Sequence, residues 1–562
     1  MKTRNKLYDK SRLRLLCLLT ALLGIFGAGQ TWAGNPTTLT VGGTNALNGG
    51  YWLTNADGTL TEASADNYNV YYDGNGTLTL KDATINGTNI IGHVGAGIYA
   101  EGDLTIVLEG SSTVTGVQDP NDESQSIRVS GNLTIQGGSL TAQGAETSSG
   151  SSYGIFVTGS FTQQSGIVTA IGGNVSGNYS SEGLYVYGGT VTVERGTLTA
   201  TGGNTSGSSY GISARGTVTV GSAAVTATGG SGNASYGLYI DSASPSVNLS
   251  DNGSLTARSE SADRAGGIYV LNLFGSAGAV TVGDNSTLLA NSVILYDNSF
   301  TEKPLAPTGN GSWLIYGQSN QPSAVGGTYT LEENITIPSG AVVTIPAGST
   351  LTIPEDKTLT ADADQLVVNG ELVLEGTFEN AKNLTGSGNL VLGEITLTDD
   401  EGIGAYEDYQ LKLKSKKVTY VRALSDNSQY GTICLPFVPT SVAGGQVTYY
   451  QVSELESDEI TLVETDFEAG KPLFYQTPGT GSITFSAESA AGVELVTIPA
   501  TDSFMVGTMS VDTPTAGYFL KNGNIYPITD RVQVKVKSFR AYVKGQNDAS
   551  QASVMSVNVA RP

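Results

Sequence analysis

A short motif recurs seven times between Gly97 and Ala290, and this repeat constrains the fold more than any other feature of the chain. Each copy opens with a small residue followed by an aliphatic one, and successive copies begin 26 to 30 residues apart. A unit of this size cannot bury its apolar face alone, so the copies must stack on one another. The seven pairs are Gly97-Ile98, Ser126-Ile127, Gly154-Ile155, Gly183-Leu184, Gly211-Ile212, Gly237-Leu238 and Gly267-Ile268.

Each copy has the pattern of short strands rather than helices. In one copy, apolar and polar residues alternate over 184–187, 190–193 and 197–201, with glycine-containing corners between the segments. Period-two alternation is typical of strands, and glycine allows the positive φ that tight corners need. We therefore predict an all-β fold in which residues 34–300 form a right-handed parallel β-helix with three short strands per coil. The side chains expected to point inward in this copy are Leu184, Val186, Val191, Val193, Leu198 and Ala200, whereas the threonines, Tyr185 and Tyr187 point outward.

Two further segments follow the repeat. Thr-Ile-Pro recurs at 336–338, 344–346 and 352–354, and each proline is expected at a corner or bulge because proline cannot donate to a sheet. Residues 301–400 are thus predicted to form a smaller, short-period β-solenoid or linker. From 401 to 562, bulky residues alternate between turns, which favours a C-terminal β-sandwich. Its core is expected to contain Phe437, Phe474, Phe519 and Phe539.

Residues 1–33 have the pattern of a secretory signal peptide: a basic stretch, the apolar run 15–26, and Thr31-Trp32-Ala33 as a small-x-small ending. No later segment reaches the roughly 18 apolar residues of a spanning helix. We therefore expect an exported chain, extracellular or at the cell surface, that does not span the membrane. Without the signal peptide only Cys434 remains, so no disulfide within the chain is expected. The net charge of −23 disfavours nucleic acids and anionic lipids as partners, since both are negative.

The best candidate for a binding surface is a column of residues that directly follow the seven pairs. Period two places them outward, between two inward neighbours. Sugar rings stack on exposed aromatic side chains, and tyrosine hydroxyls can bond to sugar hydroxyls. An alternative stays open, in which the rings only stabilise neighbouring coils. Packing is also the expected role of Tyr153, Tyr210 and Tyr236, which precede the glycines. The candidate carbohydrate-binding residues are Tyr99, Phe156, Tyr185, Tyr239 and Tyr269, with Arg128 and Ser213 at the other two positions.

Catalytic groups are not expected in the repeat. Its carboxylates, such as Asp103, Glu194 and Asp241, occupy different positions in their coils, whereas glycan-cleaving enzymes need a clustered set. The single histidine, His93, lacks the spacing of a nucleophilic triad or zinc site.

A loop at 118–123 interrupts one coil and offers three carboxylates, those of Asp119, Asp122 and Glu123. Oxygen ligands of this kind suit Ca²⁺, which makes the loop a candidate calcium site although EF-hand spacing is absent. No other cofactor is expected.

The coil pattern, Gly-Ile/Leu-Tyr followed by Leu/Val-Thr-Val and Leu-Thr-Ala-x-Gly-Gly, resembles non-catalytic carbohydrate-binding β-helix proteins of anaerobic gut bacteria, within the pectate-lyase-like superfamily. Residues 68–80 resemble their N-terminal coils, and 430–437, 518–520 and 538–542 resemble a C-terminal module of Bacteroidetes surface proteins. The resemblance implies a secreted or surface-bound protein that binds a polysaccharide or other glycan. Two alternatives are an adhesive surface rod with a protein partner and a polysaccharide lyase or hydrolase.

Overall fold

The structure is a computed structural model of the 562-residue chain. It divides into two compact units, residues 1–311 and 312–562, and each is described by itself. The fold is almost entirely β, arranged as a β-solenoid of about nine turns, which confirms the predicted fold class at this level. The predicted signal peptide lies outside the described residues. These are 34–87, 89–90, 94–117, 123–260, 264–272, 278–296, 302–317, 322–404, 406, 409–424, 430–456, 459–477, 481–521, 524–529, 532–545 and 554–560.

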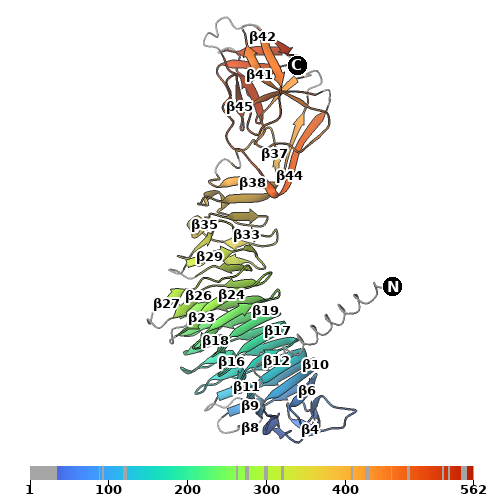
Figure 1. Ribbon diagram of the computed structural model, residues 1–562, viewed down its shortest axis with the longest axis vertical. Coiled ribbons are helices and arrows are strands. Elements are labelled where there is room, and N and C mark those ends of the chain that lie inside the picture. The colour runs from blue at the N-terminus through green and yellow to red at the C-terminus, as the bar shows by residue number, and fades with distance from the viewer. Residues whose placement is uncertain are drawn as a thin grey trace, which may run out of the picture. The chain divides into compact units, whose positions relative to one another are not determined.

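In the first unit, each copy of the repeat contributes one strand to a parallel sheet, called sheet A here (Figure 1). The ladder keeps the motif in register, so that Ile127 lies between Ile98 and Ile155 in the coils on either side. Period 26 to 30 therefore corresponds to one coil. The parallel strands of sheet A are β9 (Val94–Glu101), β11 (Glu123–Val129), β13 (Ser152–Val157), β16 (Ser181–Val186), β18 (Ser208–Ala214), β20 (Ala234–Asp241), β23 (Arg264–Leu271) and β26 (Val293–Tyr296).

The other strands of this unit form a second set of parallel ladders. In one coil, β14 (Phe161–Gln163) and β15 (Ile167–Ile171) are separate strands, but both pair with the single long strand β17 (Val191–Thr201) of the next coil. β17 in turn pairs with β19 (Val218–Gly229). The number of separate strands thus differs between coils, and three per coil stays a prediction.

The interior of the first unit is a stack of aliphatic side chains. All six side chains that the alternation predicted to point inward in the copy at 183–201 are 0% exposed. In the next coil, Val191 faces Val218 and Leu198 faces Val225, and these two valines are 0% and 1% exposed. The predicted register is therefore confirmed, and burial of these columns supplies the main stabilisation of the solenoid.

The small residue of each pair is required by a close backbone approach. A Cβ atom added to Gly183 would lie 2.5 Å from the backbone nitrogen of Thr201 and 2.7 Å from the carbonyl oxygen of Ala170. Ser126 occupies the equivalent position in its coil, where its hydroxyl donates to the Val114 carbonyl at 2.7 Å. Only the smallest side chains fit where sheet A passes this close to the strands on the other side of the coil.

Antiparallel strands adjoin the first coils. Strand β1 (Thr38–Val41) pairs antiparallel with β9, and β5 (Val70–Tyr72) pairs antiparallel with β6 (Thr77–Lys81). These pairings satisfy backbone groups at the start of the parallel stack, which would otherwise form an open edge.

The second unit begins with narrower coils. Its parallel ladder runs through β30 (Thr328–Thr330), β33 (Thr350–Ile353), β36 (Glu371–Leu374), β37 (Asn389–Leu397) and β38 (Lys412–Ala423).

The three Thr-Ile-Pro prolines lie at corners of these coils. The carbonyls of Pro338, Pro346 and Pro354 accept bonds from the backbone nitrogens of Ala341, Ser349 and Lys357, each three residues on. The corner prediction is confirmed. The eight-residue period is one side of a coil and not a whole coil, because Thr328 pairs with Thr350 in the next coil.

Beyond β38 most pairings are antiparallel, beginning with that of β38 and β44 (Ser482–Glu494). Two small sheets follow, β39-β43-β41-β42-β49 and β45-β48-β46-β47. Side chains of both sheets, among them Phe474 and Val543, share one hydrophobic cluster. Phe437, Phe474 and Phe539 are 0% exposed, as predicted, but Phe519 is only half-buried because it lines a pocket. The bounds of the strands in the two sheets are β39 Tyr430–Ile433, β41 Thr448–Leu455, β42 Glu459–Glu464, β43 Leu473–Gln476, β45 Met505–Thr508, β46 Gly517–Lys521, β47 Asn524–Ile528, β48 Arg540–Val543 and β49 Ser556–Val559.

Candidate functional site

The predicted column of outward residues lies in register along sheet A. Tyr185 shows the local geometry: it is half-buried on the outer face, while its neighbours Leu184 and Val186 are fully buried. Adjacent members occupy adjacent coils, and the ring centroids of Phe156 and Tyr185 are 5.2 Å apart, as coil stacking predicts. The ladder order of the column is Tyr99, Arg128, Phe156, Tyr185, Ser213, Tyr239 and Tyr269.

A second column of tyrosines joins the first. Tyr153 stacks on Tyr185 with ring centroids 5.6 Å apart, and Tyr210 stacks on Tyr239 at 4.8 Å. Tyr236 contacts Tyr269 at 4.5 Å. The packing role predicted for the tyrosines before the glycines is therefore present, and their partners are the candidate binding residues themselves. The resulting aromatic strip consists of Tyr153, Phe156, Tyr185, Tyr187, Tyr210, Tyr236, Tyr239, Tyr269 and Tyr296.

Most rings of the strip stack face to face on a neighbouring ring. The Tyr210–Tyr239 and Tyr239–Tyr269 pairs are nearly parallel, at 12° in both cases. Exposure differs widely along the strip, from 6% for Tyr236 to 47% for Tyr187. The deeper tyrosines can therefore present little more than ring edges and hydroxyls, whereas Tyr187 presents an accessible ring.

A polar break divides the strip. The ring contacts between described residues fall into two groups, one around Tyr185 and one around Tyr239. Between them lie Ser213, which follows Tyr185 in the first column, and Glu182, which lies between Tyr153 and Tyr210 in the second. Both are small or polar side chains at positions where neighbouring coils carry rings.

The carboxyl of Glu182 is buried within this break. The residue is 4% exposed, and its Oε2 atom has no hydrogen-bond partner. The pKa of Glu182 is raised to about 8, mainly by burial and also by the charge of Glu123, against the opposing effects of the Ser213 hydroxyl and the Arg215 cation. At neutral pH the group is therefore mainly a neutral carboxylic acid that can donate as well as accept a hydrogen bond.

Charged residues border the strip and contact its rings. The Arg215 guanidinium lies 4.1 Å from the ring centroid of Tyr187, and that of Arg128 lies 4.7 Å from Phe156. The Tyr269 hydroxyl donates to Glu302 at 3.2 Å. Burial raises the pKa of Tyr185 to about 12, so its hydroxyl stays neutral and able to donate. This arrangement can bind a polar ligand along its length through hydroxyls, carboxyls and guanidinium groups.

Tyr99 stands apart from the ring contacts of the strip. Its hydroxyl donates to Glu101 at 2.8 Å, and Thr38 donates to the other carboxylate oxygen of Glu101 at 2.7 Å. Arg128 separates Tyr99 from Phe156 in the ladder. This end of the predicted column is thus a polar cluster rather than a stack of rings.

The other predicted site residues are only partly described. Asp119, Asp122 and His93 lie outside the described residues. Glu123 is half-buried and accepts a bond from the Gln125 amide at 3.1 Å. Within the described ranges, no group of three or more His, Cys, Asp or Glu side chains could hold a metal ion, and the calcium site stays a prediction.

Glu182 did not stand out in the sequence. Asp103, which the sequence analysis named among the scattered carboxylates, accepts two bonds from Asn132 of the next coil. The usable signal for Glu182 was its position: it directly precedes a Gly-Leu pair, where Tyr153 and Tyr210 stand in the adjacent coils.

Comparison with known proteins adds no identification. No family model matches the chain, and no curated protein or solved structure matches it. In the part of the chain that the structure describes, no helix is both long and apolar enough to cross a membrane.

Proposed function

We propose that the chain is a secreted or cell-surface, non-catalytic carbohydrate-binding protein that holds a polysaccharide along the aromatic strip. The observation that carries this proposal is the register of the strip. Aromatic side chains occupy equivalent positions in neighbouring coils, at Phe156 and Tyr185 and again at Tyr239 and Tyr269. A repeated surface of this kind suits a repeated ligand.

The geometry favours an extended polymer over a single sugar. Coils repeat at about 4.8 Å, so a strip of several coils offers a row of hydroxyl and carboxyl groups rather than one enclosed pocket. Stacking of sugar on ring is expected mainly at Tyr187, which is 47% exposed. Elsewhere, hydrogen bonds from tyrosine edges would carry the binding. In this scheme Arg215, which lies over Tyr187, bonds to sugar hydroxyls beside that ring.

Several finer features belong to the same proposal. They are the right hand of the helix, three strands per coil, the C-terminal β-sandwich, export by a signal peptide, and kinship with pectate-lyase-like glycan-binding proteins. The shared cluster between the two small C-terminal sheets supports the sandwich. The basic and apolar segments of residues 1–33 support export.

The test is a panel of immobilised plant and mucin polysaccharides, probed with the purified protein with and without Ca²⁺. We expect retention on at least one polysaccharide, with no release of reducing ends or unsaturated products. Retention on none, alongside tight capture by a purified protein of a host or bacterial surface, would replace the proposal with the adhesive alternative. Turnover that one carboxylate substitution abolishes would replace it with the enzymatic one.

Substitutions of two tyrosines of the strip, one exposed and one buried, distinguish binding from packing. Tyr187→Ala should weaken retention about fivefold to tenfold while leaving the melting temperature within about 2 °C, because its ring is half exposed and stacking is worth roughly 1 kcal/mol. Tyr269→Ala should lower the melting temperature, because Tyr269 is 8% exposed and packs on three other rings. If Tyr187→Ala leaves retention unchanged, stacking of sugar on this ring is not a source of the binding.

A further inference from the structure

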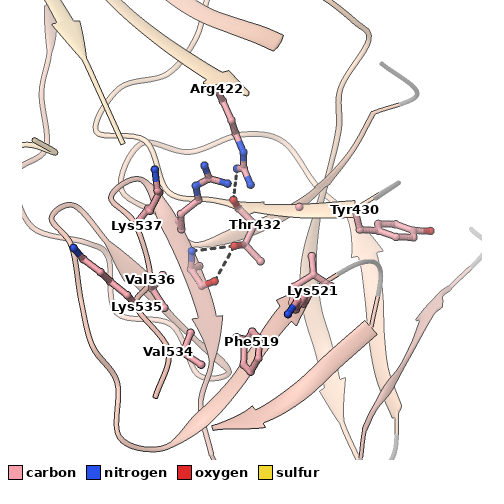
Figure 2. Close-up of a pocket in the computed structure, with 13 residues that line it drawn as sticks. Arg422, Tyr430, Thr432, Phe519, Lys521, Val534, Lys535, Val536 and Lys537 are labelled. Atoms are coloured by element: carbon pink, nitrogen blue, oxygen red, sulfur yellow. Dashed lines mark hydrogen bonds between the residues drawn. The ribbon is translucent and has the colours of Figure 1, made fainter. Parts of the chain in front are cut away.

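The second unit contains a pocket of about 400 Å³ with an unusual charge. Figure 2 shows it between β46, which carries Phe519 and Lys521, and the segment that carries Val534 to Lys537. Five of the lining residues are cationic: Arg422, Lys521, Lys535, Lys537 and Arg540. None of the described lining residues is acidic. In a chain with 51 Asp and Glu against 28 Lys and Arg, this is the reverse of the overall balance.

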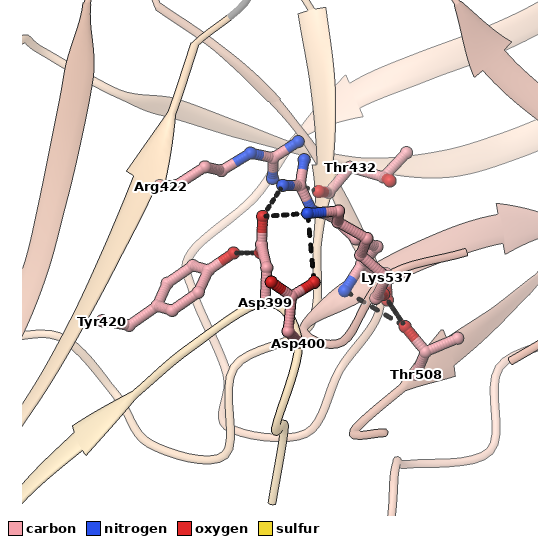
Figure 3. A network of polar contacts seen from close by, with 8 residues as sticks. Asp399, Asp400, Tyr420, Arg422, Thr432, Thr508 and Lys537 are labelled. Atoms are coloured by element: carbon pink, nitrogen blue, oxygen red, sulfur yellow. Dashed lines mark hydrogen bonds and ion pairs between the residues drawn. The ribbon is translucent and has the colours of Figure 1, made fainter. Parts of the chain in front are cut away.

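Two of the lining residues, Lys537 and Arg540, belong to a polar network that also contains two carboxylates (Figure 3). Asp399 accepts bonds from the Tyr420 hydroxyl at 2.5 Å and from Arg540 Nη2 at 2.6 Å. Lys537 pairs with Asp400 at 3.2 Å and lies 4.0 Å from Asp399. The two carboxylates offset only part of the charge of the five cations, so the pocket keeps an excess of positive charge.

Arg422 shows that this excess extends into the interior. It is 6% exposed, donates to the Thr432 carbonyl, and lies 4.6 Å from the ring centroid of Tyr475. The pKa of Arg422 is lowered to about 10, mainly by burial and also by the neighbouring Arg540 cation. A buried guanidinium next to a second one is costly unless an anion compensates both.

Two cationic groups retain unused donors. The Nε atom of Arg540 is buried and has no hydrogen-bond partner. Lys521 is exposed and forms no ion pair with any described residue, and Figure 2 shows its side chain directed toward the pocket. A buried donor without a partner normally indicates a missing ligand, water or ion.

The remaining wall is apolar. Phe519, Leu520 and Val534 are each half-buried and line the same pocket. A volume of about 400 Å³ lies within the roughly 300–1,000 Å³ of pockets that hold small organic molecules and exceeds what one inorganic anion fills. Cationic donors next to an apolar wall fit a ligand with one charged end and one ring or hydrocarbon body.

The geometry points to a binding site for a small organic anion, a ring compound that carries a carboxylate, sulfate or phosphate group. The oxyanion would take donors from Arg540 and Lys521, which both line the pocket, and the ring would lie against Phe519. This site is separate from the aromatic strip and does not depend on the proposed polysaccharide binding.

A purely structural network is the competing explanation. It accounts for Asp399, Tyr420 and Arg540, which tie the segment after β37 to β38 and β48. It does not account for Lys521, or for the apolar wall opposite the cations.

Isothermal titration calorimetry on the full chain tests the site with charged and neutral probes of similar shape. The anionic probes are glucuronate, glucose 6-sulfate, glucose 6-phosphate and benzoate, and the neutral ones are glucose and benzyl alcohol. We expect at least one anionic probe to bind at least tenfold more tightly than its neutral counterpart, and to weaken as salt rises from 0.05 to 0.5 M, as screening requires. The pattern among the four anions distinguishes carboxylate from sulfate or phosphate and sugar from aromatic ring. Inorganic phosphate binding as tightly as the best organic anion would overturn the assigned ligand class, and no binding of any anion would overturn the site.

Variants of exposed lysines keep the test independent of folding, since Arg422 or Arg540 variants could unfold the unit. Lys521→Gln should weaken the best anion about tenfold, the effect of losing one charge-assisted hydrogen bond. Lys412→Gln is the control, because it removes the same charge from a lysine that is also exposed but lies outside the pocket. Equal affinities for the two variants would overturn the site. Tyr187→Ala should leave anion binding unchanged, so failure of the strip and failure of the pocket give different results.

Discussion

The substitution Glu182→Gln tests most directly whether the carboxyl buried in the polar break is neutral. Gln has the shape of a protonated glutamic acid but cannot ionise, so the variant keeps the neutral form at every pH. In the wild type, burial raises the pKa of Glu182 from 4.5 to about 8. The side chain is 4% exposed, and Oε2 has no partner that would stabilise a negative charge. The ionised form is therefore the unfavourable one in the folded protein.

The sign of the pH effect follows from proton linkage. Between the unfolded pKa and the folded pKa, the folded state holds a proton that the unfolded state has lost, so the free energy of unfolding falls as pH rises through this window. The shift from 4.5 to about 8 corresponds to at most about 5 kcal/mol, at about 1.4 kcal/mol for each pH unit. Local rearrangement or water entry would reduce this value. The Glu182→Gln variant should match the wild type at pH 5 and be several kcal/mol more stable at pH 8.5.

Urea unfolding at half-unit pH steps from 5 to 9, followed by far-ultraviolet circular dichroism, gives the comparison. Stacked repeats can unfold in parts, so hydrogen exchange of β16 should be measured as well, because it reports on the coil that contains the residue. Glu194→Gln is the control, since it removes the same charge from an exposed side chain of the same coil. Parallel stability curves for wild type and Glu182→Gln across this range would refute the buried, neutral carboxyl.

Three other outcomes can be checked by thermal melting or chemical unfolding. Gly183→Ala should destabilise the chain by about 1 to 3 kcal/mol because the new Cβ meets backbone atoms at 2.5 Å, whereas Gly393→Ala, with nothing within 4 Å, should be tolerated. Leu198→Ala should cost about 2 to 5 kcal/mol, since Leu198 is 0% exposed and leaves a cavity between two coils; a loss below 1 kcal/mol would contradict the buried column. Within the strip, Tyr269→Ala should lower stability, whereas Tyr187→Ala should lower polysaccharide retention. If the two substitutions changed stability equally and retention equally, that would contradict the difference in exposure between the two tyrosines.

Period-two alternation was sufficient to predict which side chains of the repeat face inward. Leu198 and Ala200 alternate with threonines, and only a strand with one buried face satisfies that pattern. The same parity rule cannot bring Tyr153 and Phe156 together, because residues three apart should lie on opposite faces. Their rings nevertheless meet at 5.3 Å. The alternation breaks at the intervening Gly154, where the backbone comes close to its neighbours, and sequence periodicity does not reveal such a break.

The pocket of the second unit lay beyond sequence reasoning for a different reason. Asp399, Arg422, Lys521 and Arg540 belong to four separate segments. Their meeting depends on long-range antiparallel pairings, such as β38 with β44 and β45 with β48, that no local pattern specifies. The acidic composition of the whole chain also gives no sign of a cationic site, because the net charge is a sum over the whole chain and does not report the charge around one pocket.

The aromatic strip can pack neighbouring coils together and bind a ligand at the same time. Tyr239 packs nearly parallel to both Tyr210 and Tyr269, so its ring faces are occupied and it supports the coil stack. The residue as a whole is nevertheless only half-buried, and it belongs to the same strip as the more exposed Tyr187. A polymer lying along this surface would pass over the polar break, beneath which Glu182 is buried. A neutral carboxyl there does not repel an acidic sugar, whereas the ionised carboxylate would. Retention of acidic polysaccharides should therefore decline more steeply than that of neutral ones as pH rises through about 8, and Glu182→Gln should remove the difference.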